Sequence, residues 1–214
     1  MSKKTVKLVT SGVFIALSVV LSMIKVYQLP YGGSITLVSM LPVMMLSYMY
    51  GVKWGLSCGA VFGVIQALLG ATTTSAFAGV TGFNVVLMAL LDYIIAFMVL
   101  GTAGLFKGKI KNHTIAFVLG GIVAGLLRYL AHFLSGVLLW GSYAEWFFGA
   151  ENMNNSFGNA VLENFSGTGL VMVYSLVYNG SFMIPEIIIT AIVIAIIINI
   201  KPIQTRIVQE GKSK

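Results

Sequence analysis

Long apolar runs with almost no charge are the feature that most restricts how this chain can fold. Of its 214 residues, 58% are hydrophobic and 9% are charged, whereas about a quarter of the residues in soluble globular domains are charged. A chain of this size cannot bury so much apolar surface in a single core, so lipid must cover the remainder. The sequence therefore predicts an all-α integral membrane protein.

Six apolar segments can be distinguished, and most of them approach the roughly 17–25 residues that cross a bilayer as a helix. The predicted spans are residues 8–27, 35–50, 54–70, 85–106, 114–140 and 170–200. The second and third are short, and a polar stretch, 141–169, precedes the sixth. No internal repeat is visible, which argues against a transporter built from two matching halves. We expect one membrane domain, 1–214, formed by a bundle of six transmembrane helices.

Basic residues fall almost entirely on one side of this predicted bundle. If both termini share a side, that side holds Lys3, Lys4, Lys7, Lys53, Lys107, Lys109, Lys111, Lys201, Arg206, Lys212 and Lys214. The opposite side holds only Lys25, and its long loop, 141–169, carries three glutamates and no basic residue. The positive-inside rule therefore places the N- and C-termini in the cytoplasm and 141–169 outside the cell. This asymmetry accounts for the net charge of +7 without a nucleic-acid partner.

Ionisable residues also occur inside the predicted spans, where they are costly and usually mark a substrate path. Asp92 and Glu186 each lie fifteen residues from a lysine on the cytoplasmic side, and Arg128 lies seventeen from another. At about 1.5 Å per residue, the three side chains would share one level, roughly 22–26 Å from the inner surface. His132 follows Arg128 by four residues and projects from the same helical face. Two interpretations remain open: a substrate site, or a structural ion pair of Arg128 with Glu186 or Asp92.

Charge at this level favours a cationic ligand. Two carboxylates and one guanidinium leave one negative charge if His132 is neutral, and a cation would remove the cost of burying it. Aromatic side chains, whose faces attract cations and stack on flat heterocycles, accompany these groups. They are Tyr93, Tyr129, Trp140, Tyr143 and Trp146. The outermost of them could equally be interfacial anchors.

Other classes of protein lack the residues that they need. Two histidines and one cysteine assemble neither a metal site nor a nucleophile–base pair, so we expect no enzyme, no metal and no cofactor. No Gly-x-x-x-x-Gly-Lys-Ser/Thr loop occurs, so an ATP-driven step would need partner subunits. A proton-coupled secondary transporter remains an alternative, because Asp92, His132 and Glu186 could relay protons.

Three blocks of sequence resemble the substrate-binding S component of energy-coupling factor (ECF) vitamin transporters, the thiamine-specific family in particular. They are YGGSITLVSMLPVMMLSYMYGVKWGLSCGAVFGVIQALLG, LLDYIIAFMVLGTAGLF, and LLRYLAHFLSGVLLWGSYA with the later YSLVYNG. The third is the most specific, since it keeps Tyr-x-x-His-Phe followed by Trp and Tyr. The resemblance implies high-affinity thiamine binding at the outer face of a prokaryotic plasma membrane. It also implies uptake driven through a transmembrane coupling subunit and two ATPase subunits.

The resemblance further implies which residues bind the vitamin. These are Asp92, Tyr93, His132, Trp140, Tyr174 and Asn179, with Arg128 where the family keeps a basic residue. Departures from the family pattern are Asp92 in place of a longer Glu, Gly33 where a tryptophan can stand, a longer 141–169 loop, and Glu186, which has no counterpart. These departures leave thiamine, its pyrimidine precursor and another vitamin open as ligands.

The first predicted helix carries a candidate contact for the coupling subunit. Such helices usually present a small-xxx-small face to that subunit, and small residues at this spacing permit close helix packing. The family's alanine positions fall here on Val13 and Leu17, while Gly12 and Ala16 offer a neighbouring face. We expect Gly12 and Ala16 to make this contact.

Overall fold

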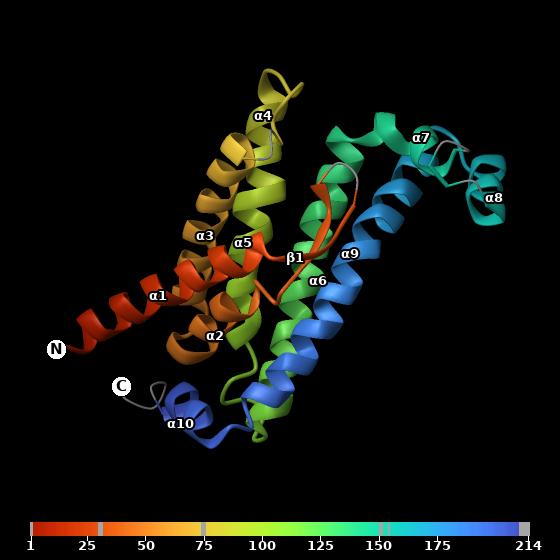
Figure 1. The fold of residues 1–214 in the computed structure, drawn as a ribbon. Coiled ribbons are helices and arrows are strands. Elements are labelled where there is room, and N and C mark those ends of the chain that lie inside the picture. Colours follow the sequence, from red (N-terminus) through yellow and green to blue (C-terminus); the bar gives the residue numbers. More distant parts are fainter. Residues whose placement is uncertain (1, 30–31, 74–75, 150–151, 154, 210–214) are drawn as a thin grey trace.

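A computed structural model describes residues 2–29, 32–73, 76–149, 152–153 and 155–209 (Figure 1). Five stretches of these residues are long and apolar enough to cross a membrane: Lys3–Met23, Val52–Thr73, Phe83–Gly104, His113–Leu139 and Gly167–Ile197. A sixth apolar helix, Leu41–Tyr50, is only 10 residues long. The predicted all-α membrane fold is therefore confirmed, with five long helices and one short one where six spans were predicted.

The elements of the N-terminal half are α1 (Lys3–Met23), β1 (Lys25–Gln28), β2 (Ser34–Thr36), α2 (Leu41–Tyr50) and α3 (Val52–Thr73). The next span is a composite of α4 (Phe83–Met88), the π-helix η2 (Ala89–Ile95), α5 (Ala96–Met98) and the 3-10 helix η3 (Val99–Gly104). The C-terminal half contains α6 (His113–Leu139), η4 (Gly141–Tyr143), α7 (Ala144–Phe148), α8 (Ser156–Asn164), α9 (Gly167–Ile197) and α10 (Lys201–Gln209).

Three predicted segments have a different structure. The first predicted span, 8–27, ends as a helix at Met23, and its last residues belong to strand β1. The apolar stretch 35–50 begins as strand β2, which pairs antiparallel with β1, and becomes helical only at Leu41. A proline beside the helix start, Pro42, suits the first turn, where no backbone donor is needed. The stretch 141–169 is not a plain loop, because it contains η4, α7 and α8. The side chain of Asn155 caps α8 by accepting a hydrogen bond from the backbone N–H of Gly158 (2.9 Å).

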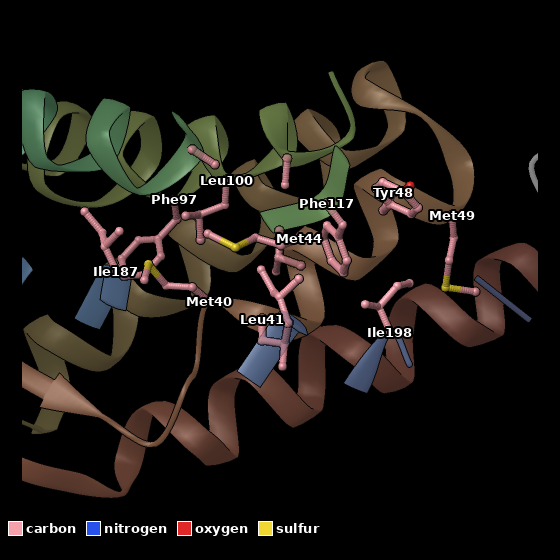
Figure 2. Close-up of a cluster of buried hydrophobic side chains, with 14 of the residues drawn as sticks. Met40, Leu41, Met44, Tyr48, Met49, Phe97, Leu100, Phe117, Ile187 and Ile198 are labelled. Carbon is pink, nitrogen blue, oxygen red and sulfur yellow. The ribbon is translucent and has the colours of Figure 1, made fainter. Parts of the chain in front are cut away.

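The main hydrophobic core surrounds α2. Its side chains Met44 and Tyr48 are fully buried, and Figure 2 shows Met40, Met44 and Phe97 gathered in one cluster. Glycines allow the composite span to lie directly against α3: a Cβ added at Gly63 would lie 2.7 Å from the carbonyl oxygen of Tyr93. This close contact fixes the part of the chain that carries Asp92 and Tyr93.

The long helices α6 and α9 pack side by side (Figure 1). Gly125 of α6 lies at this contact, because a Cβ there would be 2.5 Å from the side chain of Ile187. A second buried cluster joins α7 and α8 to the start of α9 through Phe147, Phe148 and Val161. In Figure 1, α7 and α8 lie at the opposite end of the molecule from α10 and the start of α1. Placing both termini in the cytoplasm stays a prediction.

Candidate functional site

A cavity of about 640 Å³ lies among the β1–β2 pair (the hairpin), the ends of α1 and α3, the composite span, α6 and α9. Its volume is in the range of small-molecule binding sites. It is lined by the six residues that the resemblance assigns to the vitamin and by Arg128: Asp92, Tyr93, Arg128, His132, Trp140, Tyr174 and Asn179. Among the described residues, Glu186 lies behind the cavity wall, and Gly12 and Ala16 lie apart from it, exposed on α1. The candidate residues of the composite span, of α6 with its cap, and of α9 thus converge on one cavity.

The carboxylate of Asp92 is the focus of the polar contacts in this cavity. Its Oδ1 lies 3.2 Å from Nδ1 of His132, while its Oδ2 accepts hydrogen bonds from Ser135 Oγ (2.6 Å) and from Trp140 Nε1 (3.5 Å). Asp92 belongs to the π-helix η2, a rare backbone form that is frequent at functional sites. The Asp92 side chain remains 18% exposed, and the cavity provides that exposure. The carboxylate is therefore held by donors from one side and open to a ligand on the other.

The hydrogen bonds of His132 determine where its proton lies. Arg128 Nε donates to His132 Nε2 across 3.3 Å. A guanidinium has no acceptor and keeps its charge in proteins, so Nε2 must be the unprotonated nitrogen. Nδ1 therefore carries the proton and donates it to Asp92. A neutral imidazole of this tautomer can lie beside a cationic ligand without repulsion.

Arg128 does not form the ion pair that the sequence left open as an alternative. Within the described ranges, its guanidinium contacts His132 and lies over the ring of Phe97, with Cζ 4.3 Å from the ring centroid. The carboxylate of Glu186, 2% exposed, accepts instead from the backbone N–H of Thr36 (2.7 Å) and from its hydroxyl (2.6 Å). The sequence could not indicate this partner, because Thr36 lies on a strand that the apolar pattern concealed.

The end of the cavity beside Trp140 is aromatic. The rings of Trp140 and Tyr143 lie with centroids 6.1 Å apart, and Tyr93 stacks on Phe77 with centroids 5.5 Å apart. Tyr174 of α9 completes this wall and is almost fully buried. These side chains give the cavity flat apolar surfaces beside the Asp92 carboxylate.

Asn179 joins α9 to α6 at the cavity wall. Its Nδ2 donates to the backbone oxygen of His132 (3.2 Å) and to that of Ser175 (2.9 Å). The helices can approach here because Gly136 faces Ser175 and Asn179 without a side chain. Asn179 therefore orients the helix turn that carries His132 as well as lining the cavity.

Several lining residues were not foreseen. Tyr178 and Phe182 continue the helical spacing of Tyr174, so a periodicity search along α9 could have found them. Ser135, which does not line the cavity but donates to Asp92, lies three residues after His132 on the same helix. The hairpin residues Gln28, Gly33, Ser34 and Thr36 gave no such signal, because their segment was predicted to be partly helical.

Gly33 is the departure from the family pattern whose reason is now visible. A Cβ at this position would lie 2.7 Å from Cδ1 of Phe182. The ring of Phe182 thus occupies the space beside Gly33 and makes an edge contact with His132, with centroids 5.9 Å apart. A tryptophan at position 33 would have to displace Phe182.

The Asp92 carboxylate, which faces the cavity, suits a small flat cation. Of the described residues, two carboxylates, Asp92 and Glu186, and two cationic side chains, Arg128 and Lys25, lie in or near the cavity wall, so these charges balance when His132 is neutral. No group of three or more His, Cys, Asp or Glu side chains that could hold a metal ion occurs in the part of the chain that the structure describes. The arrangement is one for binding by charge, stacking and hydrogen bonds.

Comparisons with known proteins agree with the family that the sequence blocks resemble. The model of a family described as thiamine transporter protein (Thia_YuaJ) matches residues 8–151. The thiamine transporter ThiT of Bacillus subtilis is 30% identical over 212 residues, covering 94% of each chain. ThiT of Lacticaseibacillus paracasei is 26% identical over 185 residues, covering 81% of this chain and 77% of its own.

The fold also has a counterpart among solved structures. ThiT from Listeria monocytogenes superposes with a TM-score of 0.68 at 21% identity, over 94% of this chain and 97% of its own. The bacterial relatives and the apolar helices identify a multi-pass membrane protein of a prokaryotic cell. On the match of its family model and the full-length similarity to the Bacillus subtilis protein, the chain belongs to the thiamine transporter family.

Proposed function

We propose that this protein binds thiamine with high affinity at the outer face of the membrane and takes it up. The observation that carries the proposal is the Asp92 carboxylate, held by three donors and open to a cavity of about 640 Å³. Thiamine has a permanently charged thiazolium ring and a flat aminopyrimidine ring. A carboxylate beside aromatic faces is suited to both.

Each lining residue has a task in this proposal. Asp92 offers its negative charge to the thiazolium ring or to the amino group of the pyrimidine. Trp140 stacks on one ring, and His132, neutral, packs beside the ligand. Tyr93, Tyr174 and Asn179 meet the polar edges. Several such contacts in a preformed cavity would support nanomolar affinity, about −12 kcal/mol.

We further propose that the chain works as one membrane domain, the S component of an ECF transporter, with a coupling subunit and two ATPase subunits. The exposed face of α1 supports this proposal. Gly12 has open space around it, with nothing within 4 Å of an added Cβ, and the neighbouring Val13 is 60% exposed. Gly12 and Ala16 would admit a helix of the coupling subunit at close range.

Transport in proteoliposomes tests the mode of uptake. The chain alone, under a proton gradient and without ATPase subunits, should accumulate no radiolabelled thiamine. Together with a coupling subunit and ATPases, it should accumulate thiamine when ATP is supplied inside. Accumulation by the chain alone under the proton gradient would instead establish the proton-coupled alternative, with Asp92, His132 and Glu186 as the candidate relay.

Competition by related compounds tests the identity of the ligand. Unlabelled thiamine should displace radiolabelled thiamine from the purified protein at nanomolar concentration, whereas biotin, riboflavin and the isolated pyrimidine precursor should need far higher concentrations. Stronger displacement by the pyrimidine precursor or by another vitamin would identify that compound as the ligand.

A further inference from the structure

Glu186 is a buried carboxylate that the binding site described above does not use directly. Its side chain is 2% exposed and lies in the middle of α9, one residue after Pro185. Both of its oxygens accept from a single residue, since Oε2 takes the backbone N–H of Thr36 and Oε1 takes the hydroxyl. A buried carboxylate with two close donors from one strand residue is a strong and directional attachment.

The attachment belongs to a row of three contacts between α9 and the hairpin. Tyr178, Phe182 and Glu186 recur every four residues and so share one face of the helix. The hydroxyl of Tyr178 accepts from the backbone N–H of Gly33 (3.1 Å), and the ring of Phe182 packs against Gly33. Glu186 holds the other end of strand β2, at Thr36. One face of α9 therefore fixes β2 along its length.

The strand held in this way forms part of the cavity wall. Gly33, Ser34 and Thr36 line the cavity, whereas Glu186 lies behind them. The hydrogen bonds of Glu186 can therefore act on the ligand through the position of strand β2, whereas its charge acts at longer range and is tested separately by Glu186→Gln. Breaking the contact would leave a carboxylate and a backbone N–H buried without partners, which opposes movement of the strand away from α9.

We propose that Glu186 is a positioning residue that holds strand β2 in place at the cavity wall and thereby sets how slowly the ligand dissociates. This inference rests on the proposed thiamine binding, which it extends to a residue outside the cavity. Glu186 attaches the far end of β2, and the contacts of Tyr178 and Phe182 at Gly33 hold the near end. Strand β2 cannot move away from α9 and the cavity until the carboxylate releases Thr36.

Dissociation of radiolabelled thiamine, chased with excess unlabelled thiamine, tests the proposal in purified full-length protein. Glu186→Leu removes both hydrogen bonds and should raise the dissociation rate constant about 10- to 100-fold, with a smaller change in the association rate constant. Glu186→Gln can still pair with both groups but without charge, so its increase should be smaller. Glu163→Gln on α8, where the glutamate is exposed, is the matched control and should dissociate like the wild type.

A double-mutant cycle with Thr36→Val separates positioning from general packing. Thr36→Val keeps the backbone donor and removes the hydroxyl. If the two residues act as a unit, adding Thr36→Val to Glu186→Leu should change the dissociation rate less than Thr36→Val does in the wild type. Fully additive effects, or a lower Tm of the empty protein with an unchanged dissociation rate, would show that Glu186 only supports the fold and would overturn the proposal.

Hydrogen–deuterium exchange of the empty protein gives a readout that does not depend on thiamine. The amide of Thr36 should exchange at least tenfold faster in Glu186→Leu than in the wild type, and amides within α6 should be unaffected. Failure of the wild type to bind thiamine would remove the proposed function but leave this result standing. Unchanged exchange at Thr36 would contradict the attachment itself, and if Glu186→Leu does not fold, Glu186→Gln and Thr36→Val carry both measurements.

Discussion

Replacing Asp92 by asparagine keeps the size of the side chain and removes its charge. A carboxylate offers about four acceptor sites, and Ser135, His132 and Trp140 already take three of those of Asp92. About one acceptor position therefore remains for the ligand. The loss of one charge-assisted contact corresponds to about 1.5–3 kcal/mol, which is roughly a 10- to 150-fold increase in the Kd for thiamine.

The assay is a calorimetric titration of thiamine into purified Asp92→Asn protein. Glu145→Gln is the control, because Glu145 is an exposed carboxylate on α7, outside the cavity, and its removal tests for a general effect of charge. The Kd of the control should match that of the wild type. An unchanged Kd in Asp92→Asn would refute the reasoning, since the carboxylate would then contribute nothing to the free energy of thiamine binding.

Three further substitutions distinguish the tasks of residues on α6 and at its C-terminal cap, Trp140. Trp140→Ala should weaken thiamine binding by about 1–3 kcal/mol, the value measured for stacking of an aromatic side chain on a nucleic-acid base. It should also abolish most of the quenching of tryptophan fluorescence by the ligand. Full quenching in this variant would mean that Trp54 or Trp146 reports binding and that the site is not at Trp140. Arg128→Ala should lower the Tm of the empty protein by several degrees, because it removes the donor to His132 and a buried stacking contact. His132→Ala should also lower the Tm, because it leaves Arg128 Nε and Asp92 Oδ1 without this partner, and it should weaken thiamine binding more than Arg128→Ala does, as thermal unfolding and titration will show. A larger loss of binding in Arg128→Ala than in His132→Ala would reverse the assigned roles and favour an anionic ligand.

The features that the sequence predicted correctly depend on local pattern. Long apolar runs determine which segments become helices, because the bilayer sets their length. The shared depth of Asp92 and Arg128 followed from helix rise alone, and both residues line the same cavity. The resemblance to a family then added Tyr174 and Asn179, which no spacing argument had connected to Asp92.

The features that the sequence concealed depend on contacts between distant segments. Residues 35–40 are as apolar as the helix that follows, so nothing local separated strand β2 from α2. The partner of Glu186 was hidden for the same reason, since Thr36 lies on that strand. The π-helix around Asp92 also has no sequence signature of its own; the close contact of Gly63 with the backbone of Tyr93 accompanies it in three dimensions.

Direct calorimetric titration of thiamine into the purified wild-type protein tests the central proposal most simply. We expect one molecule of thiamine to bind per chain with a nanomolar Kd. The reason is that the described part of the cavity wall contains one carboxylate, that of Asp92, with aromatic stacking surfaces beside it. Saturable binding at this stoichiometry would support the site as described. No heat of binding at micromolar thiamine, from protein that is folded by its thermal unfolding curve, would contradict it.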